Sequence, residues 1–467
     1  MSKIPFSQTA YEIVKLLQNN GYEAYLVGGC VRDGLMGKAS HDEDITTNAH
    51  PKEVMRLFKD DPQVLTGLKH GTVSIIRHHE LYEITTFRED FGSDGRRPES
   101  ISFADSLEDD VKRRDLTINA LAYDPVKDEI IDYVGGVEDL NNHMIRTVGE
   151  ASVRFKEDYL RMMRAIRFTT QLGFNLDPIA IKAIQENVEG IHLISMERIK
   201  AELDRIMVSD KPSIGIRLLR ESGLLKAILP EVDVMFETPQ NTPYHIYDVG
   251  EHTMRVVDHI QPLLHRRYAA LFHDIGKPDA RFTKDGIDHF YGHAEISYDL
   301  SLKIMTRLKF SRNDRELISL MVLHHDEAIS TKRRSMIRYY MKNSALMDEH
   351  YNDMRDLWLS DCFGQSQQQY ESRVADIEII DTFYQSLFAG PHTLKDLAVN
   401  GYDIIKLKDE AGEQLVVGVD IREVLERLRH HVIQFPQDNN RERLLTLVPG
   451  LYKSLKTEQK QKKKTSD

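Results

Sequence analysis

Short apolar runs rich in β-branched and aromatic residues fall within the first 145 residues and predict strands at residues 24–27, 72–76 and 81–87. From Phe155 onward, apolar residues recur at spacings of three and four, which predicts long helices separated by breakers such as Asp177-Pro178. The pattern therefore predicts an α+β fold. A head with a small mixed sheet flanked by helices should precede an elongated, all-helical neck, body and tail.

The chain has 467 residues, enough for about three domains with cores of their own. The change from strands to helices and the later breakers divide it into a head (1–145), a helical neck (146–210), a helical body (211–375) and a tail (376–467). The tail ends in a Lys-rich segment that we expect to be disordered.

Composition narrows the class of protein. The net charge of −12 argues against a chain coated with nucleic acid, although local basic clusters at residues 154–167 and 332–338 could still bind RNA. No apolar stretch is long enough to span a bilayer, so we expect a cytoplasmic protein with no membrane partner. Cys30 and Cys362 are too few for a disulfide framework.

Acidic residues in the head suggest a metal site. Asp42 and Asp44 are two residues apart, and in an extended segment such residues project from one face. A divalent cation would relieve their repulsion and keep coordination positions for phosphate oxygens. Glu83, in the predicted strand 81–87, could add a third carboxylate, and two Mg²⁺ ions there would suit phosphoryl transfer. An isolated pair of this kind is otherwise a solvated strand end.

Two further segments of the head could bind a nucleotide. Gly28-Gly29 ends a predicted strand and would let backbone N–H groups approach an anion, with Arg32 adding positive charge. In Arg113-Arg114-Asp115, guanidinium groups can bind phosphate and the carboxylate can accept a hydrogen bond from a ribose hydroxyl. The alternative for the second segment is an ion-pair cluster on the surface.

Together these motifs, in this order, resemble the class II tRNA nucleotidyltransferases and bacterial poly(A) polymerases of the polymerase β superfamily. The resemblance implies that Asp42 and Asp44 bind the metal, that Glu83 is the third acidic residue, and that Gly29 and Arg32 contact the nucleoside triphosphate. Residues 88–98 would be the mobile loop that accompanies addition of a terminal A. The motifs that carry it are G-G-x-V-R-D (28–33), D-x-D-I (42–45), G-T-V (71–73), E-I-T-T-F-R (83–88) and R-R-D-x-T-x-N-A (113–120).

The neck contains a candidate base reader. A helix over residues 154–168 would place Asp158 and Arg161 on one face. Cytosine and adenine both present an exocyclic amine beside a ring-nitrogen acceptor, so a carboxylate next to a guanidinium would select C and A over G and U. An ordinary ion pair within the helix is the alternative. The segment resembles the nucleotide-selection motif of the same family, which implies base reading by Asp158 and Arg161 and nucleotide binding by Arg164 and Arg167.

The body contains a second constellation of histidine and aspartate. It resembles the HD superfamily of metal-dependent phosphohydrolases, and the resemblance implies a possible second divalent metal. Whether this part is hydrolytic or serves only to bind tRNA stays open. The matching residues are His252, His273, Asp274 and Asp361.

The sequence thus predicts a template-independent enzyme that adds C, C and A to the 3′ end of tRNA from CTP and ATP and releases pyrophosphate. We expect tRNA, ATP and CTP as partners and no stable protein partner. An A-adding enzyme that works with a separate CC-adding enzyme, or a poly(A) polymerase, would use the same chemistry. A phosphohydrolase acting through the HD residues is the more distant alternative.

Overall fold

The computed structural model describes residues 4–39, 42–96, 98–242, 246–327 and 330–464. The chain forms two compact units, of which the first comprises residues 1–241 and 247–319 and the second residues 242–246 and 320–467. The boundaries that we inferred from sequence at residues 145, 210 and 375 remain predictions.

A seven-stranded mixed sheet forms the centre of the head, as predicted. Its neighbouring strands are antiparallel except for β2 and β5, which run parallel. The three strands expected from sequence are β1, β4 and β5. The strand order is β3 (Gln63–Val64), β4 (Thr72–Arg77), β5 (Glu80–Thr86), β2 (Ile45–Thr47), β1 (Ala24–Val27), β8 (Ala122–Asp124) and β9 (Glu129–Ile131).

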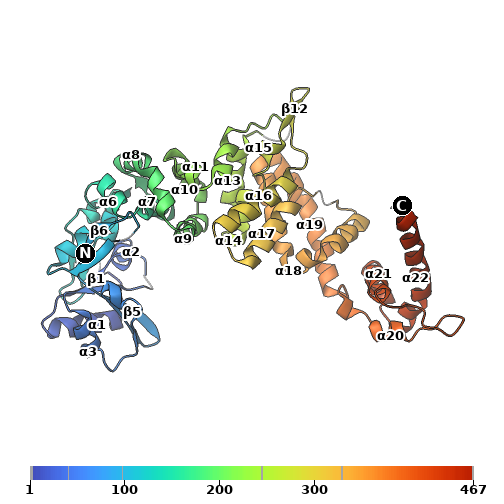
Figure 1. Cartoon of the computed structure of the whole chain (residues 1–467), viewed down its shortest axis with the longest axis horizontal. Helices are drawn as coiled ribbons and strands as arrows, with labels where there is room; N and C mark the ends of the chain where they lie inside the picture. Colours follow the sequence, from blue (N-terminus) through green and yellow to red (C-terminus); the bar gives the residue numbers. More distant parts are fainter. Residues whose placement is uncertain (1–3, 40–41, 97, 243–245, 328–329, 465–467) are drawn as a thin grey trace. The chain divides into compact units, whose positions relative to one another are not determined.

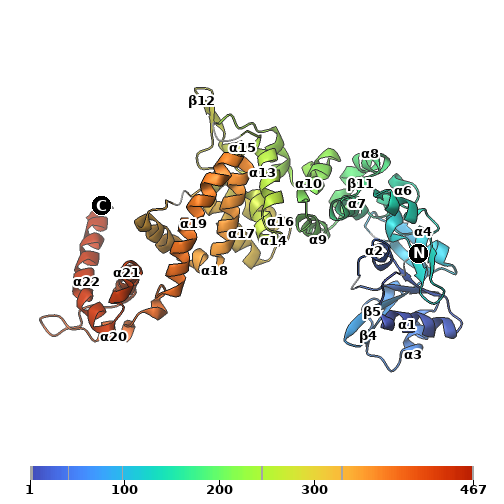
Figure 2. The same ribbon diagram turned by 180° about the vertical axis from the view of Figure 1, so that it is seen from behind.

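Both faces of this sheet are covered, because apolar residues alternate between two cores. Leu26 belongs to one core and its neighbour Val27 to the other. Figures 1 and 2 show α1 (Gln8–Asn19) and α3 (Pro51–Leu57) against the strands of the head, where they cover the face to which Leu26 belongs. The other helices of the head are α2 (Gly29–Leu35), α4 (Leu107–Lys112) and α5 (Gly136–Asn141).

The segment predicted to be a mobile loop instead forms a β-hairpin, although its tip lies partly outside the described residues. Strands β6 (Arg88–Ser93) and β7 (Pro98–Phe103) pair antiparallel, from Arg88 opposite Phe103 to Ser93 opposite Pro98. The sequence prediction was wrong here because polar and glycine residues dominate the segment, while the ladder of backbone hydrogen bonds makes no demand on its side chains.

The rest of the first unit is helical apart from two small two-stranded sheets. The predicted breaker Asp177-Pro178 starts a helix: an Asp177 Oδ1 accepts a hydrogen bond from the Ile179 N–H at 3.0 Å, and Pro178 occupies the first turn. The elements are α6 (Ala151–Glu157), α7 (Leu160–Leu172), α8 (Pro178–Asn187), α9 (Met196–Met207), α10 (Pro212–Glu221), α11 (Leu224–Ile228), α12 (Pro230–Asp233), α13 (Val249–His259), α14 (Leu264–Phe272), α15 (Lys277–Ala280), α16 (His293–Arg307) and α17 (Arg312–His324), with strands β10 (Met144–Ile145), β11 (Asn175–Leu176), β12 (Phe282–Lys284) and β13 (Ile287–His289). The last residues of α17, from Leu320, belong to the second unit.

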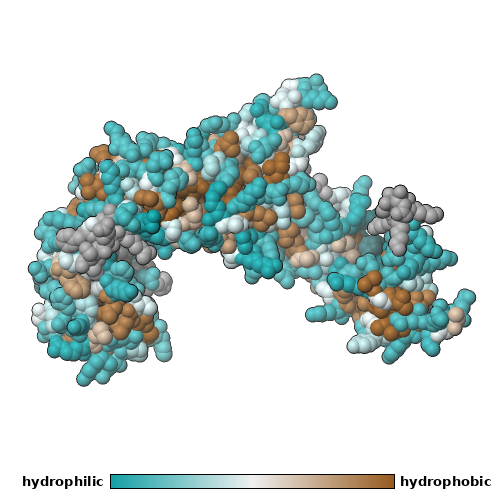
Figure 3. All heavy atoms as spheres, viewed as in Figure 1, coloured by the Kyte–Doolittle hydropathy of each residue, from teal (hydrophilic) through white to brown (hydrophobic). Residues whose placement is uncertain are grey.

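The second unit consists of helices. The Lys-rich end, expected to be disordered, continues as a helix to Lys464, because lysine, glutamine and glutamate have high helix propensity. Hydrophilic residues cover most of the face drawn in Figure 3. Along the described chain, no helix is long and apolar enough to cross a membrane. The helices are α18 (Arg333–Gln365), which is interrupted at Asn343 and His350, α19 (Gln367–Ala389), α20 (Gly401–Ile405), α21 (Asp420–Gln434) and α22 (Arg441–Lys464).

Candidate active site

The parallel pairing of β2 with β5 brings Asp44 and Glu83 together. Ile45 lies opposite Ile84, so Asp44 and Glu83, each one residue earlier, are neighbours on the same face of the sheet. Both side chains are exposed, as is that of Asp42. Partial burial by neighbouring protein, followed by the negative charge of Glu83 and a smaller contribution from Asp42, raises the pKa of Asp44 to about 6.

The three carboxylates share a neighbourhood without forming a closed ligand set. Within the described part of the chain, they are not among the groups whose ligand atoms all lie within 4.8 Å of one another. The segment 42–44 precedes β2, so Asp42 and Asp44 are held at the end of a strand, whereas Glu83 lies within β5. The shared face of Asp42 and Asp44 stays a prediction, and the register of the sheet places Glu83 beside Asp44.

Arg32 of α2 is largely buried instead of projecting towards solvent. Its Nη1 donates to Oδ1 of Asn119 at 2.5 Å, and its Nε donates to Oδ1 of its neighbour Asp33 at 2.8 Å. Its guanidinium lies 5.1 Å from the ring centre of Phe168 in the neck. The preceding Gly28 has φ of +82°, so the strand-to-helix turn depends on glycine there, and Gly29 begins the helix.

Arg113 and Arg114 are held by a buried carboxylate that sequence reasoning missed. Asp110 is fully buried and accepts hydrogen bonds from Nε and Nη2 of Arg113, at 3.0 and 2.7 Å, and from Nη2 of Arg114 at 3.4 Å. It also accepts from the backbone N–H of Arg88, where the β6–β7 hairpin begins. Asp110 lies in α4, three residues before the arginine pair, and that helical spacing was the available signal.

The positive charge that reaches the carboxylates at β2 belongs to Arg114. It opposes the rise in the pKa of Asp44. A side chain at Gly28 would place its Cβ 3.3 Å from Nη1 of Arg114, so the glycine turn and this guanidinium are in close contact. Arg114 therefore lies between the glycine turn and the acidic group.

Asp115 links the head to the neck. Its Oδ2 accepts a hydrogen bond from Nε of Arg164 at 2.6 Å, and its Oδ1 accepts from the Leu116 N–H at 2.9 Å. Burial alone would raise the pKa of Asp115, but Arg164, with a smaller contribution from Arg161, outweighs burial and lowers that pKa. Two residues expected to bind nucleotide thus contact each other across the head and neck.

Asp158 and Arg161 do not lie on one continuous helix, so the predicted helix over residues 154–168 was wrong at its centre. Helix α6 ends at Glu157, Asp158 is extended with φ of −153°, and α7 begins at Leu160. The Asp158 carboxylate accepts hydrogen bonds from the Leu160 N–H at 3.1 Å and from Arg198 at 2.7 Å. The Asp158 side chain thereby caps the second helix, which explains the break.

Arg161 contacts different partners from Asp158. Its Nη1 pairs with Glu157 and its Nη2 donates to the backbone carbonyl of Arg113 at 3.0 Å. The i, i+3 ion pair considered as the alternative to base reading is therefore not present. Each candidate base reader is oriented by its own partners: those of Asp158 lie in the neck, and those of Arg161 lie in both the neck and the head.

Arg198, in α9, is a second residue that sequence reasoning missed. Besides Asp158, it donates to the backbone carbonyl of Arg96 at 2.8 Å, at the tip of the β6–β7 hairpin. The carbonyl of Gly95 accepts from the Tyr159 N–H at 2.9 Å. The hairpin tip therefore contacts the neck at the residues that follow and orient Asp158.

Arg167 is placed as a supporting residue. It is buried, pairs with Glu202 at 3.1 Å, and lies 4.1 Å from the ring centre of Phe168. Burial lowers its pKa to about 10. Arg164 and Arg32 also contact this ring, so Phe168 gathers three of the predicted arginines.

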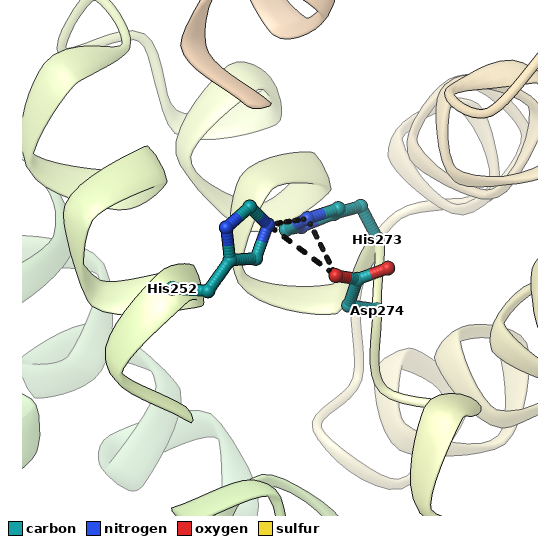
Figure 4. Close-up of side chains that lie close together, drawn as sticks. All are labelled: His252, His273 and Asp274. Carbon is teal, nitrogen blue, oxygen red and sulfur yellow. Dashed lines mark hydrogen bonds and ion pairs between the residues drawn. The ribbon is translucent and has the colours of Figure 1, made fainter. Parts of the chain in front are cut away.

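The histidine and aspartate residues of the body meet in a buried cluster at the ends of α13 and α14. Figure 4 shows the rings of His252 and His273 pointing toward each other and toward Asp274. Their Nε2 atoms are 3.1 Å apart and lie 3.3 and 3.2 Å from Oδ2 of Asp274. Lys277 also contacts Asp274, at 2.6 Å. Burial would raise the pKa of Asp274, but His273 and Lys277 outweigh it and hold that pKa well below its usual value.

A further histidine, His293, joins this cluster and was not among the predicted ligands. Its Nε2 lies 3.4 Å from Oδ1 of Asp274. In both His273 and His293, Nδ1 is within 2.9 Å of a backbone carbonyl, which favours the tautomer whose Nε2 lone pair faces the cluster. This donor set fits a divalent cation. The contact of His293 with Asp274 arises from the fold, because His293 begins α16.

Asp361 lies in the second unit, on α18, where it lines a pocket of about 270 Å³. Acidic and polar residues of α18 and α19 form most of the wall, together with Trp358 and Arg373. The predicted role of Asp361 as a metal ligand stays a prediction.

Three family models match the chain, in the same order as the parts described above. They are the "Poly A polymerase head domain" over residues 24–146, the "Probable RNA and SrmB- binding site of polymerase A" over residues 173–236, and the "HD domain" over residues 244–383. Together with the fold, they define a nucleotidyltransferase head joined to an RNA-binding neck and an HD domain. By these matches, the chain contains a poly(A) polymerase head domain, a probable RNA-binding region of polymerase A and an HD domain.

Comparison with individual relatives gives a narrower class of enzyme than the family models do. The chain is 51% identical over 216 residues to a CCA-adding enzyme of Lactobacillus helveticus and 43% identical over 283 residues to one of Geobacillus thermodenitrificans. These alignments cover 46% and 60% of this chain and 53% and 65% of the relatives, so the chain matches between half and two thirds of their length. The crystal structure of the Bacillus stearothermophilus CCA-adding enzyme in complex with CTP superposes with a TM-score of 0.69 at 28% identity, covering 97% of this chain and 98% of that one.

Proposed function

We propose that the protein is a CCA-adding tRNA nucleotidyltransferase that uses CTP and ATP. The observation that carries the proposal is the register of β2 and β5, which sets Asp44 beside Glu83 on the sheet face that Arg114 approaches. The CCA-adding relatives and the structure with CTP support the same reaction class.

A divalent metal fits this group of carboxylates. Burial, followed by the like charges of Glu83 and Asp42, raises the pKa of Asp44, and a cation would relieve the repulsion between these carboxylates. Asp42 and Asp44 would hold it, with Glu83 as the third acidic residue, and Mg²⁺ is the ion we propose. When bound, such ions would increase the acidity of the attacking hydroxyl and neutralise charge on the leaving pyrophosphate.

Residues of the chain would bind the nucleotide and shape its pocket. The 3′ hydroxyl of tRNA attacks the α-phosphorus of the bound nucleotide, and pyrophosphate leaves. Arg113 and Arg114, oriented by Asp110, would neutralise triphosphate charge, and Gly29 would leave room for it. Arg32, Arg164 and Arg167 are largely engaged by protein groups, so we assign them to shaping the nucleotide pocket where head and neck meet.

Base selection would depend on Asp158 and Arg161. A carboxylate accepts from the exocyclic amine of C or A, and a guanidinium donates to the adjacent ring nitrogen. Both groups have protein partners now, Arg198 and Glu157, so an incoming base would replace or share those contacts. Asp115, which is paired with Arg164, would accept a hydrogen bond from the ribose hydroxyl.

Incorporation on tRNA that ends at the discriminator base tests the proposal. With CTP and ATP together, we expect addition of three nucleotides, and Asp42→Ala or Asp44→Ala should abolish it. Addition of A only to tRNA already ending in CC would favour the A-adding alternative, and long A tails would favour a poly(A) polymerase. No addition of either nucleotide would contradict all three.

The buried cluster around Asp274 supports a second candidate activity. Its donor set would hold a divalent metal of its own, and HD proteins use such metals to hydrolyse phosphate esters. Release of phosphate from a phosphomonoester or of a nucleotide from a cyclic phosphodiester, retained in Asp42→Ala and lost in His273→Ala, would establish it.

A further inference from the structure

The β12–β13 hairpin of the first unit has one buried polar residue, Asp288, on one side and an exposed aromatic group on the other. Thr283 and Asp288 pair across the strands, and Asp288 is buried: it accepts hydrogen bonds from Thr283 at 2.6 Å and from the Asn241 N–H at 2.9 Å, and pairs with Arg281 at 3.2 Å. The residues that alternate with them, Phe282, Lys284, Ile287 and His289, therefore face outward. A surface hairpin ordinarily has the reverse pattern.

Three rings gather on this outward side. Phe282 lies directly opposite His289, with ring centres 5.2 Å apart and planes 25° apart. The rings of His289 and Tyr291 follow at 5.4 Å and 22°, and those of Phe282 and Tyr291 are 5.7 Å apart. Tyr291 is 76% exposed and Phe282 45% exposed. We call Phe282, His289 and Tyr291 the aromatic platform.

Single exposed aromatic residues are common on protein surfaces, but three in mutual contact are not explained by packing alone. Figures 1 and 2 show the hairpin projecting from the helices of its unit, and the inward Asp288 already anchors it. Stacked rings with an open face are what proteins use to hold unpaired bases, since every base has a π-face.

Position and charge indicate the kind of ligand. Lys284 is exposed on the same side of the hairpin as the rings, where it can meet a phosphate. Association of two copies through this face would bring the two Lys284 side chains into proximity, which is unfavourable. Tyr291 also precedes His293 by two residues, so the platform lies on the same segment as the buried cluster around Asp274.

We infer that the aromatic platform binds an unpaired nucleobase by stacking, beside the buried cluster around Asp274. The expectation that this base belongs to single-stranded RNA rests on the proposed tRNA-processing function, whereas a free nucleotide offers the same ring. The site is separate from the candidate nucleotide pocket at β2.

A tryptophan reporter in the full-length chain tests the inference. Trp358 is the only tryptophan, so Tyr291→Trp adds one emitter to a known background, and wild type is the matched control. We expect a ten-nucleotide single-stranded RNA to quench the added emission, since a base would stack on the new ring. Quenching by AMP alone, without RNA, would assign the platform to free nucleotides.

Variants in the Tyr291→Trp background separate stacking from simple apolar contact. Phe282→Leu should weaken binding roughly fivefold to a hundredfold, the range for loss of one base–aromatic stack. Phe282→Tyr should restore it, and Tyr133→Leu, an exposed tyrosine in the head, should have no effect.

Three results would overturn the inference: no quenching beyond wild type with either probe, equal binding by Phe282→Leu and Phe282→Tyr, or a dimer in sedimentation that Tyr291→Ala dissolves. None of these measurements uses nucleotide addition. The platform and the proposed CCA-adding activity can therefore fail independently.

Discussion

At the scale of single residues, the acidic group in the head and the buried Asp110 differ in how their negative charge is compensated. Asp44 is exposed and has two acidic neighbours, with only Arg114 opposing them. Asp110 is fully buried and has two arginine partners. The negative charge around Asp44 is therefore left for a cation to neutralise, whereas protein groups neutralise the buried charge of Asp110.

The raised pKa of Asp44 predicts how stability depends on pH without divalent cations. Its folded value of about 6 exceeds that of an unfolded chain, so ionised Asp44 destabilises the fold, increasingly as pH rises through the interval between the two values. We expect Asp44→Asn to unfold at a higher temperature than wild type at pH 7, with the difference vanishing near pH 4. Thermal unfolding in chelator measures this. A lower unfolding temperature for the variant at pH 7 would contradict it.

Removing the Asp110 carboxylate should cost both stability and activity. Asp110→Ala would leave two arginines near the nucleotide site without their common acceptor, and breaking a buried pair of this kind costs about 3 kcal/mol. Denaturant unfolding and CTP incorporation provide the readouts. The control is Glu108→Ala on the same helix, which removes an exposed pair with Lys112 and should change little. Equal effects of the two variants would refute the role of Asp110.

At the scale of elements, strand and helix type followed from the sequence, but the way elements contact each other did not. The period-2 and helical patterns predicted β1, β4, β5 and the helical body. The break at Asp158 was hidden, because a carboxylate that caps the next helix leaves the apolar spacing unchanged. The contacts of Arg198 with Asp158 and of Asp110 with Arg88 could not be predicted, since they join residues brought close only by folding.

The contact of the β6–β7 hairpin with the neck predicts an effect of Gly95. Its φ is +82°, and a Cβ there would lie 2.4 Å from the Tyr159 ring. We expect Gly95→Ala to release the hairpin tip and speed limited proteolysis within residues 93–98. Gly21→Ala is the matched control, because its φ is +84° with open space around the added Cβ. Equal proteolysis of both variants would show that clash with Tyr159 is unimportant.

At the scale of the whole molecule, two candidate metal sites belong to two different family regions, the head at residues 24–146 and the HD domain at 244–383. The sequence motifs predicted both regions and most of their residues. They did not include His293. The family pattern gives the types of ligand along the chain, but it does not give which helix begins with a side chain directed toward the cluster.

This separation predicts independent losses. His293→Ala should reduce the divalent metal retained after dialysis while leaving nucleotide addition within about twofold of wild type, because no head residue is altered. Asp42→Ala should instead abolish addition and retain the metal that depends on His293. Metal content by mass spectrometry and incorporation on tRNA measure the two effects, with His192→Ala, an exposed histidine of the neck, as control. Loss of both properties in either single variant would contradict independence.

The parallel alignment of β2 with β5 also restricts which changes of chain length the head can tolerate. One residue inserted between Glu83 and Ile84 would turn the Glu83 carboxylate to the opposite side of the sheet, among the apolar residues packed under α1. Two inserted residues would return it to its original side, one step further along. Homologous chains should therefore differ in length at this point only by even numbers of residues.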